Sequence, residues 1–312
     1  MAGSTASETI DVVVAADRNF RRQLAVTIAG ISEFSGGVPH RVFVLHDGYD
    51  EDLVSDVTTA AYNGVELMWI HSSSSVLDSA ILPSYLPTAT LYRLRITDLL
   101  PSDVHRVIYL DTDVVVLGSL RDLWHKDLGD TDLAAVRDSV CPWAASPLCL
   151  DWRELGIAPD TPYFNAGVML IPVARWRANR FPAQTLELLR RHAFLYGDQC
   201  ALNSVADGNW TALAPHWNAQ SGHFDDGSLS WIVESREEIT RATEHPDIVH
   251  FTSFTGRPKP WEPRSASPFR DAWFDALDRT AWAGWRPDDS PLSRTRVLAT
   301  RARRAGGVLL RG

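Results

Sequence analysis

The stretch Val107-Ile-Tyr-Leu-Asp111-Thr112-Asp113-Val-Val-Val116 decides the fold of this chain of 312 residues. Two short apolar runs enclose two carboxylates that are two positions apart. Such runs are typical of buried strands in a parallel sheet, and parallel sheets hold their ligands at the carboxyl ends of the strands. Paired hard oxygen ligands suit Mg²⁺ or Mn²⁺ bridged to a diphosphate. We therefore predict a functional site at Asp111 and Asp113.

The residues before this motif alternate between strand and helix patterns. Apolar runs cover 10–16, 41–45 and 65–70, and helical spacing of apolar residues covers 22–34 and 50–61. The alternation predicts a βαβαβ unit with right-handed crossovers and a parallel sheet.

The residues after it complete an α/β domain that we place at 1–285. Further strands are predicted at 107–110, 114–117, 133–136, 165–171 and 248–251, and helices at 88–100, 182–194, 198–205 and 268–277. The loop 138–161 has no periodicity, and 210–235 suggests short strands and loops. Long loops in compact domains are usually functional, so we predict that 138–161 is a functional loop. The boundary of the domain falls near 286, where an Arg-rich tail, 286–312, begins.

Charge is unevenly distributed along the chain. The net charge is −9, but the tail contains seven Arg and two Asp, which leaves −14 for the rest. An acidic body argues against nucleic acid as a partner, because phosphate binding needs a basic face. The tail is the one segment that could contact an anionic membrane surface.

Cysteine usage and the absence of a long apolar run indicate in which cellular compartment the protein is found. The three cysteines, Cys141, Cys149 and Cys200, are odd in number and lack C-x-x-C spacing, which suits a reducing environment and argues against a disulfide framework. The sequence shows no signal-peptide pattern and no apolar run of about 18 residues. We expect a cytoplasmic protein that contacts the inner membrane surface peripherally at most.

Other polar residues follow or flank the predicted strands. Asp17 and Asn19 end the first strand and either bind a nucleoside or cap the next helix. Asp198 and Gln199 open a helix, as a cap or as groups that stabilise positive charge at a sugar carbon. His250 ends an apolar strand and could complete a two-carboxylate metal site. The loop tryptophans are candidate acceptor contacts, or simply buried: Trp143, Trp152, Trp217 and Trp261.

Several enzyme classes compete for this pattern. The chain has no G-x-G-x-x-G after its first strand and no G-x-x-x-x-G-K-[ST], which disfavours dinucleotide-binding oxidoreductases and P-loop enzymes. Haloacid-dehalogenase-like phosphatases also carry D-x-D after an apolar strand, but near the chain start and with a downstream Lys that fits neither Lys126 nor Lys259. A nucleotide-sugar or phosphate-ester hydrolase using Asp111 and Asp113, and a non-catalytic carbohydrate-binding protein, stay open as alternatives.

Taken together, six segments in order resemble glycosyltransferase family 8, the retaining enzymes that include glycogenin-like and lipopolysaccharide galactosyl- and glucosyltransferases. The segments are Ala15-Ala-Asp17-Arg-Asn19, Leu91-Tyr-Arg93-Leu, Val107-Ile-Tyr-Leu-Asp111-Thr112-Asp113, Tyr163-Phe-Asn165-Ala166-Gly167-Val-Met-Leu-Ile, Gly197-Asp198-Gln199 and His250-Phe followed by Lys259-Pro-Trp261. The resemblance implies an α/β GT-A fold with a mixed sheet and transfer of glucose or galactose from a UDP-sugar to an acceptor hydroxyl. It leaves open whether that hydroxyl belongs to a glycan, a protein or a small natural product.

The resemblance also implies residue roles. Mn²⁺, with Mg²⁺ as the alternative, would be bound by Asp111, Asp113 and His250. Ala15, Asp17 and Asn19 would contact uridine and ribose, and Gly256 and Lys259 the diphosphate. The donor sugar would be surrounded by Arg93, Asp111, Asn165, Asp198 and Gln199, with Asp198 and Gln199 as the catalytic pair. Thr112 and Ala166 complete the implied donor-binding set. The loops 138–161 and 215–231 would form the lid and select the acceptor. The family usually has about three residues between this His and Gly, whereas Gly256 is six positions after His250.

Overall fold

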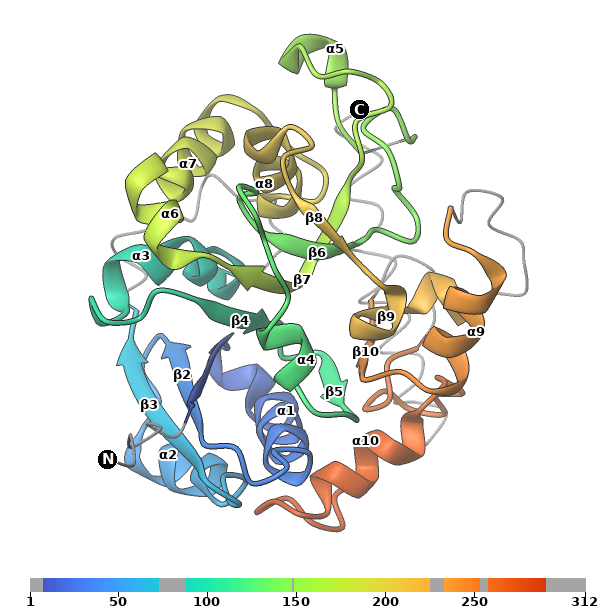
Figure 1. The fold of residues 1–312 in the computed structure, drawn as a ribbon. Helices are drawn as coiled ribbons and strands as arrows, with labels where there is room; N and C mark the ends of the chain where they lie inside the picture. Colours follow the sequence, from blue (N-terminus) through green and yellow to red (C-terminus); the bar gives the residue numbers. More distant parts are fainter. Residues whose placement is uncertain (1–7, 73–87, 148, 225–232, 253–257, 290–312) are drawn as a thin grey trace, which may run out of the picture.

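The computed structural model describes residues 8–72, 88–147, 149–224, 233–252 and 258–289. Within these residues the strands form two sheets (Figure 1). A seven-stranded sheet has the order β3-β2-β1-β4-β7-β6-β8, and a three-stranded sheet has the order β5-β10-β9. The fold is therefore α/β with a mixed main sheet, as predicted.

The N-terminal part of the main sheet is the predicted βαβαβ unit. Strands β1 (Ile10–Ala15), β2 (His40–His46) and β3 (Val65–His71) pair in parallel, and β4 (Val107–Leu110) pairs in parallel with β1. Helix α1 (Arg21–Glu33) and helix α2 (Glu51–Thr58) form the crossovers. Because side chains alternate along a strand, β1 contributes Val12 to the core on one face and Val13 to the core on the other.

The second half of the main sheet introduces antiparallel pairing. Strand β7 (Phe164–Ile171) is antiparallel to both β4 and β6 (Ala134–Arg137), while β8 (Thr211–Leu213) is parallel to β6. All eight residues of β7 are buried, which explains why all of them except Asn165 are apolar or Gly. The reversal brings the start of β7 to the same sheet edge at which β4 ends.

The small sheet begins directly after the acidic motif. Strand β5 (Val114–Val116) is antiparallel to β10 (Ile248–His250), with Val114 opposite His250. Strand β9 (Ala219–Gln220) runs parallel to β10 on its other side. This pairing brings His250 beside Asp113 although 137 positions separate them in sequence.

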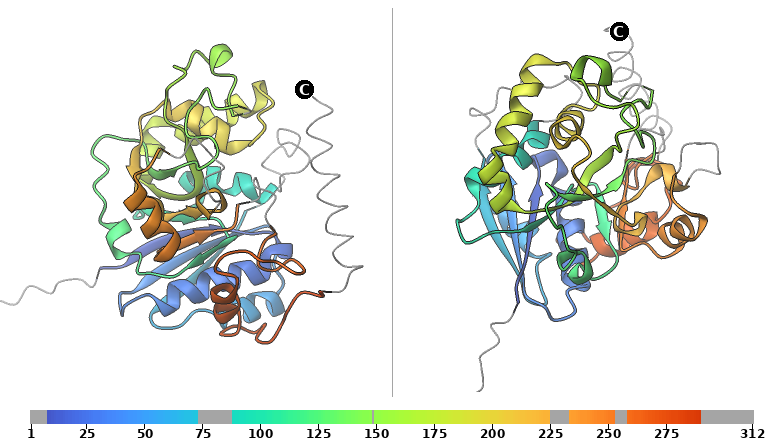
Figure 2. Two further views of the ribbon diagram at one scale, coloured as in Figure 1. Left: turned by 90° about the vertical axis from the view of Figure 1, so that its right-hand side faces the viewer. Right: turned by 45° about the horizontal axis from the view of Figure 1, so that its top comes forward.

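Helices cover both faces of the main sheet. Figure 1 places α6, α7 and α8 on one side and α1 and α2 on the other, while α10 packs against α1 at the base (Figure 2). The remaining bounds are α3 (Ile96–Leu99), α4 (Arg121–Trp124), α5 (Trp152–Leu155), α6 (Val173–Asn179), α7 (Phe181–Arg191), α8 (Asp198–Ala206), α9 (Arg236–Glu244) and α10 (Arg270–Leu277). None of the described helices combines the length and the hydropathy needed to span a bilayer.

Two expectations about helices need correction. The segment 88–100 is mostly a 3₁₀ helix, η4 (Thr88–Arg95), followed by the single turn of α3, rather than one α-helix. Helix α9 lies just after the segment read as short strands and loops. A capping box between Ser235 and Glu238 marks its start and can be seen in the sequence. The helix was not predicted because no strong apolar stripe follows the capping box.

Helix α1 contacts strand β5 at a glycine. A Cβ on Gly30 would lie 2.6 Å from the Val116 carbonyl oxygen and 3.0 Å from its Cβ. We expect Gly30→Ala to lower the free energy of unfolding by about 1–3 kcal/mol, because overpacking outweighs the helix propensity gained, which is at most about 1 kcal/mol. Urea denaturation measures this, with the exposed Ser55→Ala in α2 as control. A more stable Gly30→Ala variant would contradict close packing of α1 on β5.

Candidate active site

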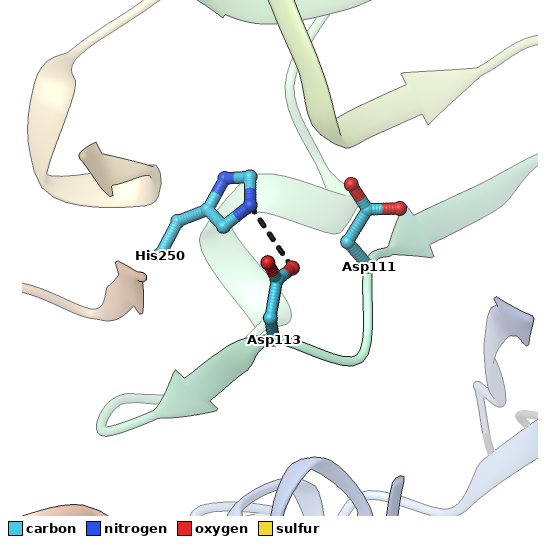
Figure 3. A group of neighbouring side chains, drawn as sticks. All are labelled: Asp111, Asp113 and His250. Atoms are coloured by element: carbon cyan, nitrogen blue, oxygen red, sulfur yellow. Dashed lines mark hydrogen bonds and ion pairs between the residues drawn. The ribbon is translucent and has the colours of Figure 1, made fainter. Parts of the chain in front are cut away.

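The predicted metal ligands converge at the edge of the main sheet. Asp111 follows β4, Asp113 precedes β5, and His250 ends β10 (Figure 3). One ligand atom from each of the three lies within 4.8 Å of the others. Two carboxylates and an imidazole form a donor set that suits a divalent ion such as Mn²⁺.

A glycine leaves the space in which this cluster sits. The backbone N–H of Asp111 donates to the Gly167 carbonyl at 2.8 Å, so β7 lies directly against the motif. A Cβ on Gly167 would run into the His250 ring and would lie 3.0 Å from Asp111 Oδ2. The imidazole and the carboxylate can share this volume only because position 167 has no side chain, and the residues present therefore fit a bound metal ion.

Asp113 has two cationic neighbours. His250 Nε2 lies 3.1 Å from Asp113 Oδ1, and Lys259 Nζ lies 2.5 Å from Oδ2. Burial opposes ionisation of Asp113, but Lys259 and His250 outweigh it and hold its pKa well below the ordinary value. The carboxylate is therefore ionised near neutral pH, as a metal ligand must be.

Arg93 connects the motif to the helix that carries Asp198. Its guanidinium lies 2.8 Å from Asp111 Oδ1 and 2.9 Å from Asp198 Oδ2, and it donates to the Ala166 carbonyl at 2.6 Å. Burial opposes the charge on Arg93, yet the two carboxylates raise its pKa above the ordinary value. Tyr109 donates its hydroxyl to the same Asp111 oxygen at 2.8 Å. One buried cation thus fixes both carboxylates.

Asp198 is a buried carboxylate rather than a helix cap. Gly197 takes the N-cap position of α8, and the Asp198 side chain points to Arg93. Burial raises the pKa of Asp198 to about 6, against the lowering effect of Arg93 and with a further rise from Asp111. The capping alternative for Asp198 is therefore wrong.

Gln199 is oriented by its neighbours. Its Oε1 accepts from the Ala166 N–H at 3.0 Å, which leaves its amide nitrogen as a donor to Asp138 Oδ2 at 3.1 Å. Asn165 Nδ2 also donates to Asp138 Oδ2, at 3.0 Å. The other Asp138 oxygen accepts the backbone N–H groups of Val140 and Cys141, both at 2.9 Å.

Asp138 was missed as a site residue. It directly follows β6, as Asp111 directly follows β4, so an acid after an apolar strand was a signal in the sequence. Asn218 was also missed. It lies in a short segment before β9, where no periodic pattern marks a buried amide.

The predicted nucleoside residues lie at the end of β1. Ala15 is buried, Asp17 is half-buried and Asn19 is exposed. Asp17 Oδ1 accepts the N–H groups of Asn19 and Phe20, so Asp17 caps a 3₁₀ turn, η1 (Arg18–Phe20), and the capping alternative is confirmed. Contact of these residues with a nucleoside stays a prediction.

The remaining predicted residues fall into three groups. Thr112 is buried between the two acids, and Lys259 contacts Asp113. The Ala166 carbonyl accepts from Arg93, and Asn165 donates to Asp138. Gly256 and the segment 290–312 of the tail lie outside the described residues, as does part of the loop 215–231. The loop tryptophans pack against other side chains, and their contact with an acceptor stays a prediction: Trp261 packs on Trp273 and Phe251 and lies under Lys259, Trp217 on His216, Trp152 against Arg153, and Trp143 against Arg137.

The cysteines correct the expectation drawn from their number. Cys141 and Cys149 form a disulfide, with Cα atoms 6.1 Å apart, and Cys200 is a buried thiol. The chain turns back between the two cysteines, with Ser146 N–H donating to the Trp143 carbonyl and Cys149 N–H to the Ser146 carbonyl. Burial raises the pKa of Cys200 to about 12, so that thiol stays protonated.

The fold and the site define a glycosyltransferase of the GT-A fold. The chain is similar to the crystal structure of the galactosyltransferase LgtC in complex with donor and acceptor sugar analogs, with a TM-score of 0.75 and 23% sequence identity. The match covers 90% of this chain and 98% of LgtC.

The chain belongs to glycosyltransferase family 8, whose family model matches residues 11–264. It is 27% identical over 283 residues to general stress protein A of Bacillus subtilis (strain 168), covering 88% of this chain and 95% of that protein. It is 24% identical to lipopolysaccharide 1,2-glucosyltransferase of Escherichia coli (strain K12), covering 97% and 86%. It is also 27% identical to glycosyltransferase GlyD of Streptococcus pneumoniae serotype 4 (strain ATCC BAA-334 / TIGR4), but spans only 30% of GlyD.

The raised pKa of Asp198 makes stability depend on pH. The folded protein holds this proton more tightly than the unfolded chain, because the pKa rises from 3.8 to about 6. We expect the stability of the wild type relative to Asp198→Asn to fall as pH rises from about 4 to about 6, and then to level off. Urea denaturation with EDTA measures both proteins at each pH. A stability difference that does not change over this range would contradict the assignment.

The disulfide closes a short loop. We expect Cys141→Ser, or reduction of the wild type, to lower the free energy of unfolding by about 2–3 kcal/mol, because the unfolded chain loses a constraint. Thiol titration of denatured, unreduced protein should find only Cys200 free. Reduction should leave the stability of Cys141→Ser unchanged. Three titratable thiols in the unreduced wild type would show that the bond does not form.

Proposed function

We propose that this protein is a metal-dependent retaining glycosyltransferase that transfers glucose or galactose from a UDP-sugar to an acceptor hydroxyl. The observation that carries this proposal is the convergence of Asp111, Asp113 and His250, which Arg93 connects to Asp198. A carbohydrate-binding protein would not need a buried ion-pair network at its ligand site.

The leaving group is a nucleoside diphosphate, and its charge must be neutralised. A divalent ion held by Asp111, Asp113 and His250 supplies positive charge at the diphosphate. Lys259 binds Asp113 in the structure, and it would be available to the phosphates if that carboxylate held a metal instead. Lys259 then stabilises the negative charge that develops on the leaving diphosphate as the bond between sugar and phosphate breaks.

The donor sugar lies between the metal cluster and helix α8 in this proposal. Arg93, Asp198, the Asn165 side chain and the backbone of Asn165 and Ala166 bind its hydroxyls and fix its orientation. Gln199 faces the anomeric carbon with its amide oxygen, which stabilises positive charge there. Attack of the acceptor on the same face as the leaving group gives retention of configuration.

The relatives' names support a hexose and a sugar acceptor. One relative is a lipopolysaccharide 1,2-glucosyltransferase, and the similar LgtC structure is a galactosyltransferase in complex with donor and acceptor sugar analogs. For this chain we propose that the loops 138–161 and 215–231 select the acceptor.

The basic tail bears on where the protein is located. We propose a cytoplasmic protein whose tail, 286–312, contacts an anionic membrane surface through its seven Arg. The disulfide removes cysteine usage as an argument for the cytoplasm, and the charge of the tail is what remains in support.

UDP release with a panel of UDP-sugars and Mn²⁺, with and without candidate acceptors, tests this function. We expect Asp111→Ala and Asp113→Ala to lower kcat/KM by about 100-fold or more, since metal-based stabilisation is worth several kcal/mol. Addition of EDTA should have the same effect on the wild type. The exposed Asp122→Ala should behave as wild type.

Two outcomes would contradict the proposal. Full activity in the Asp111→Ala and Asp113→Ala variants would overturn the site. Phosphate release from simple esters without nucleotide binding would favour the phosphate-ester hydrolase instead.

A further inference from the structure

We propose that Asn218 is a positioning residue that aims His250 at the metal and joins the metal side of the site to the sugar side. The proposal rests on the metal-dependent function above. Asn218 is completely buried and lies just before β9, the strand that pairs with β10. Its side chain contacts both His250 and Asn165.

The direction of each hydrogen bond follows from one backbone group. The Gly167 N–H can only donate, and it lies 3.0 Å from the Asn165 side chain, so the amide oxygen of Asn165 faces it. The Asn218 side chain lies 3.0 Å from that same oxygen and must present its NH₂ group there. The amide orientations of both asparagines are therefore fixed by the backbone of β7.

The orientation of Asn218 in turn determines the protonation of His250. With its NH₂ group on Asn165, Asn218 has its carbonyl oxygen 3.1 Å from His250 Nδ1. An oxygen only accepts, so Nδ1 must carry a proton and donate it. Nε2, which lies 3.1 Å from Asp113 Oδ1, is then the nitrogen that faces the position a metal would take.

The same chain of hydrogen bonds reaches the sugar side. Asn165 donates its Nδ2 to Asp138 Oδ2, the oxygen that also accepts from Gln199. His250, Asn218, Asn165, Asp138 and Gln199 thus form one continuous sequence of contacts. A change at Asn218 should therefore affect both the metal ligand His250 and the sugar-side residue Gln199.

Two substitutions of Asn218 separate its effect on the metal side from its effect on the sugar side. Asn218→Ala removes both hydrogen bonds. Asn218→Asp keeps an oxygen acceptor for His250 Nδ1 but cannot donate to the Asn165 oxygen. Carboxylate partners of metal-binding histidines are common, and loss of such partners typically costs about 10–100-fold in metal affinity.

The experiment measures Mn²⁺ affinity by electron paramagnetic resonance of free Mn²⁺, with saturating UDP and no acceptor. We expect Asn218→Ala to bind Mn²⁺ about 10–100-fold more weakly than wild type, and Asn218→Asp to stay within about 3-fold. The same Asn218→Asp protein should transfer sugar with a kcat at least about 10-fold lower at saturating Mn²⁺, because Asn165 and Asp138 lose their support.

A matched control is Asn203→Ala, which removes another buried amide. Asn203 bonds the backbone of Phe164 and Gln199 but no metal ligand, so this variant should lose stability and keep its Mn²⁺ affinity. Circular dichroism establishes that each variant is folded.

The outcomes distinguish this inference from the proposed function. A wild type that binds no Mn²⁺ would overturn the metal site itself. A wild type that binds Mn²⁺ while Asn218→Ala binds it equally well would overturn the role of Asn218 alone. If Asn218→Ala does not fold, the Asn218→Asp variant alone tests the inference. A Mn²⁺ affinity more than about 10-fold weaker than wild type in that variant, or an unchanged kcat, would overturn it.

Discussion

The backbone hydrogen bond from Asp111 N–H to the Gly167 carbonyl extends the antiparallel pairing of β4 and β7 beyond the end of β4. This bond brings two segments of the site together, because Asp111 and Asp113 lie on one side of it and Asn165 and Ala166 on the other. The close approach requires a glycine at position 167, since a Cβ there would occupy the space of the His250 ring. The metal cluster therefore depends on the register between strands β4 and β7 in the main sheet.

Charge at this edge is balanced locally rather than by the composition of the protein. The body of the chain is strongly acidic, yet each carboxylate of the site has its own partners. Asp111 has Arg93 and Tyr109, Asp113 has Lys259 and His250, and Asp138 has four N–H donors. Asp198 shares Arg93 with Asp111, and burial leaves its pKa raised. Net charge argues against nucleic acid as a partner but gives no guide to the binding of small anionic substrates.

Local pattern in the sequence was enough for the strands and for the acids that end them. The apolar runs before Asp17 and Asp111 predicted β1 and β4, and the order of six segments predicted the family. Contacts that depend on long-range pairing were beyond such patterns. Asn218 meets Asn165 only because β9 joins β10 while β7 reverses beside β4, and Cys141 meets Cys149 only because the chain turns back between them.

The loop that we assign to acceptor choice is anchored to the same residues that hold the donor side. Its first residue, Asp138, bonds Gln199 and receives the backbone N–H of Cys141, while the carbonyl of Cys149 accepts from Cys200, the neighbour of Gln199 in α8. The disulfide joins these two anchored points. Residues between and beyond the cysteines can therefore change with the acceptor without moving Asp138, because covalent and hydrogen bonds fix both ends of that part of the loop. Donor geometry and acceptor choice can thus evolve separately on one scaffold.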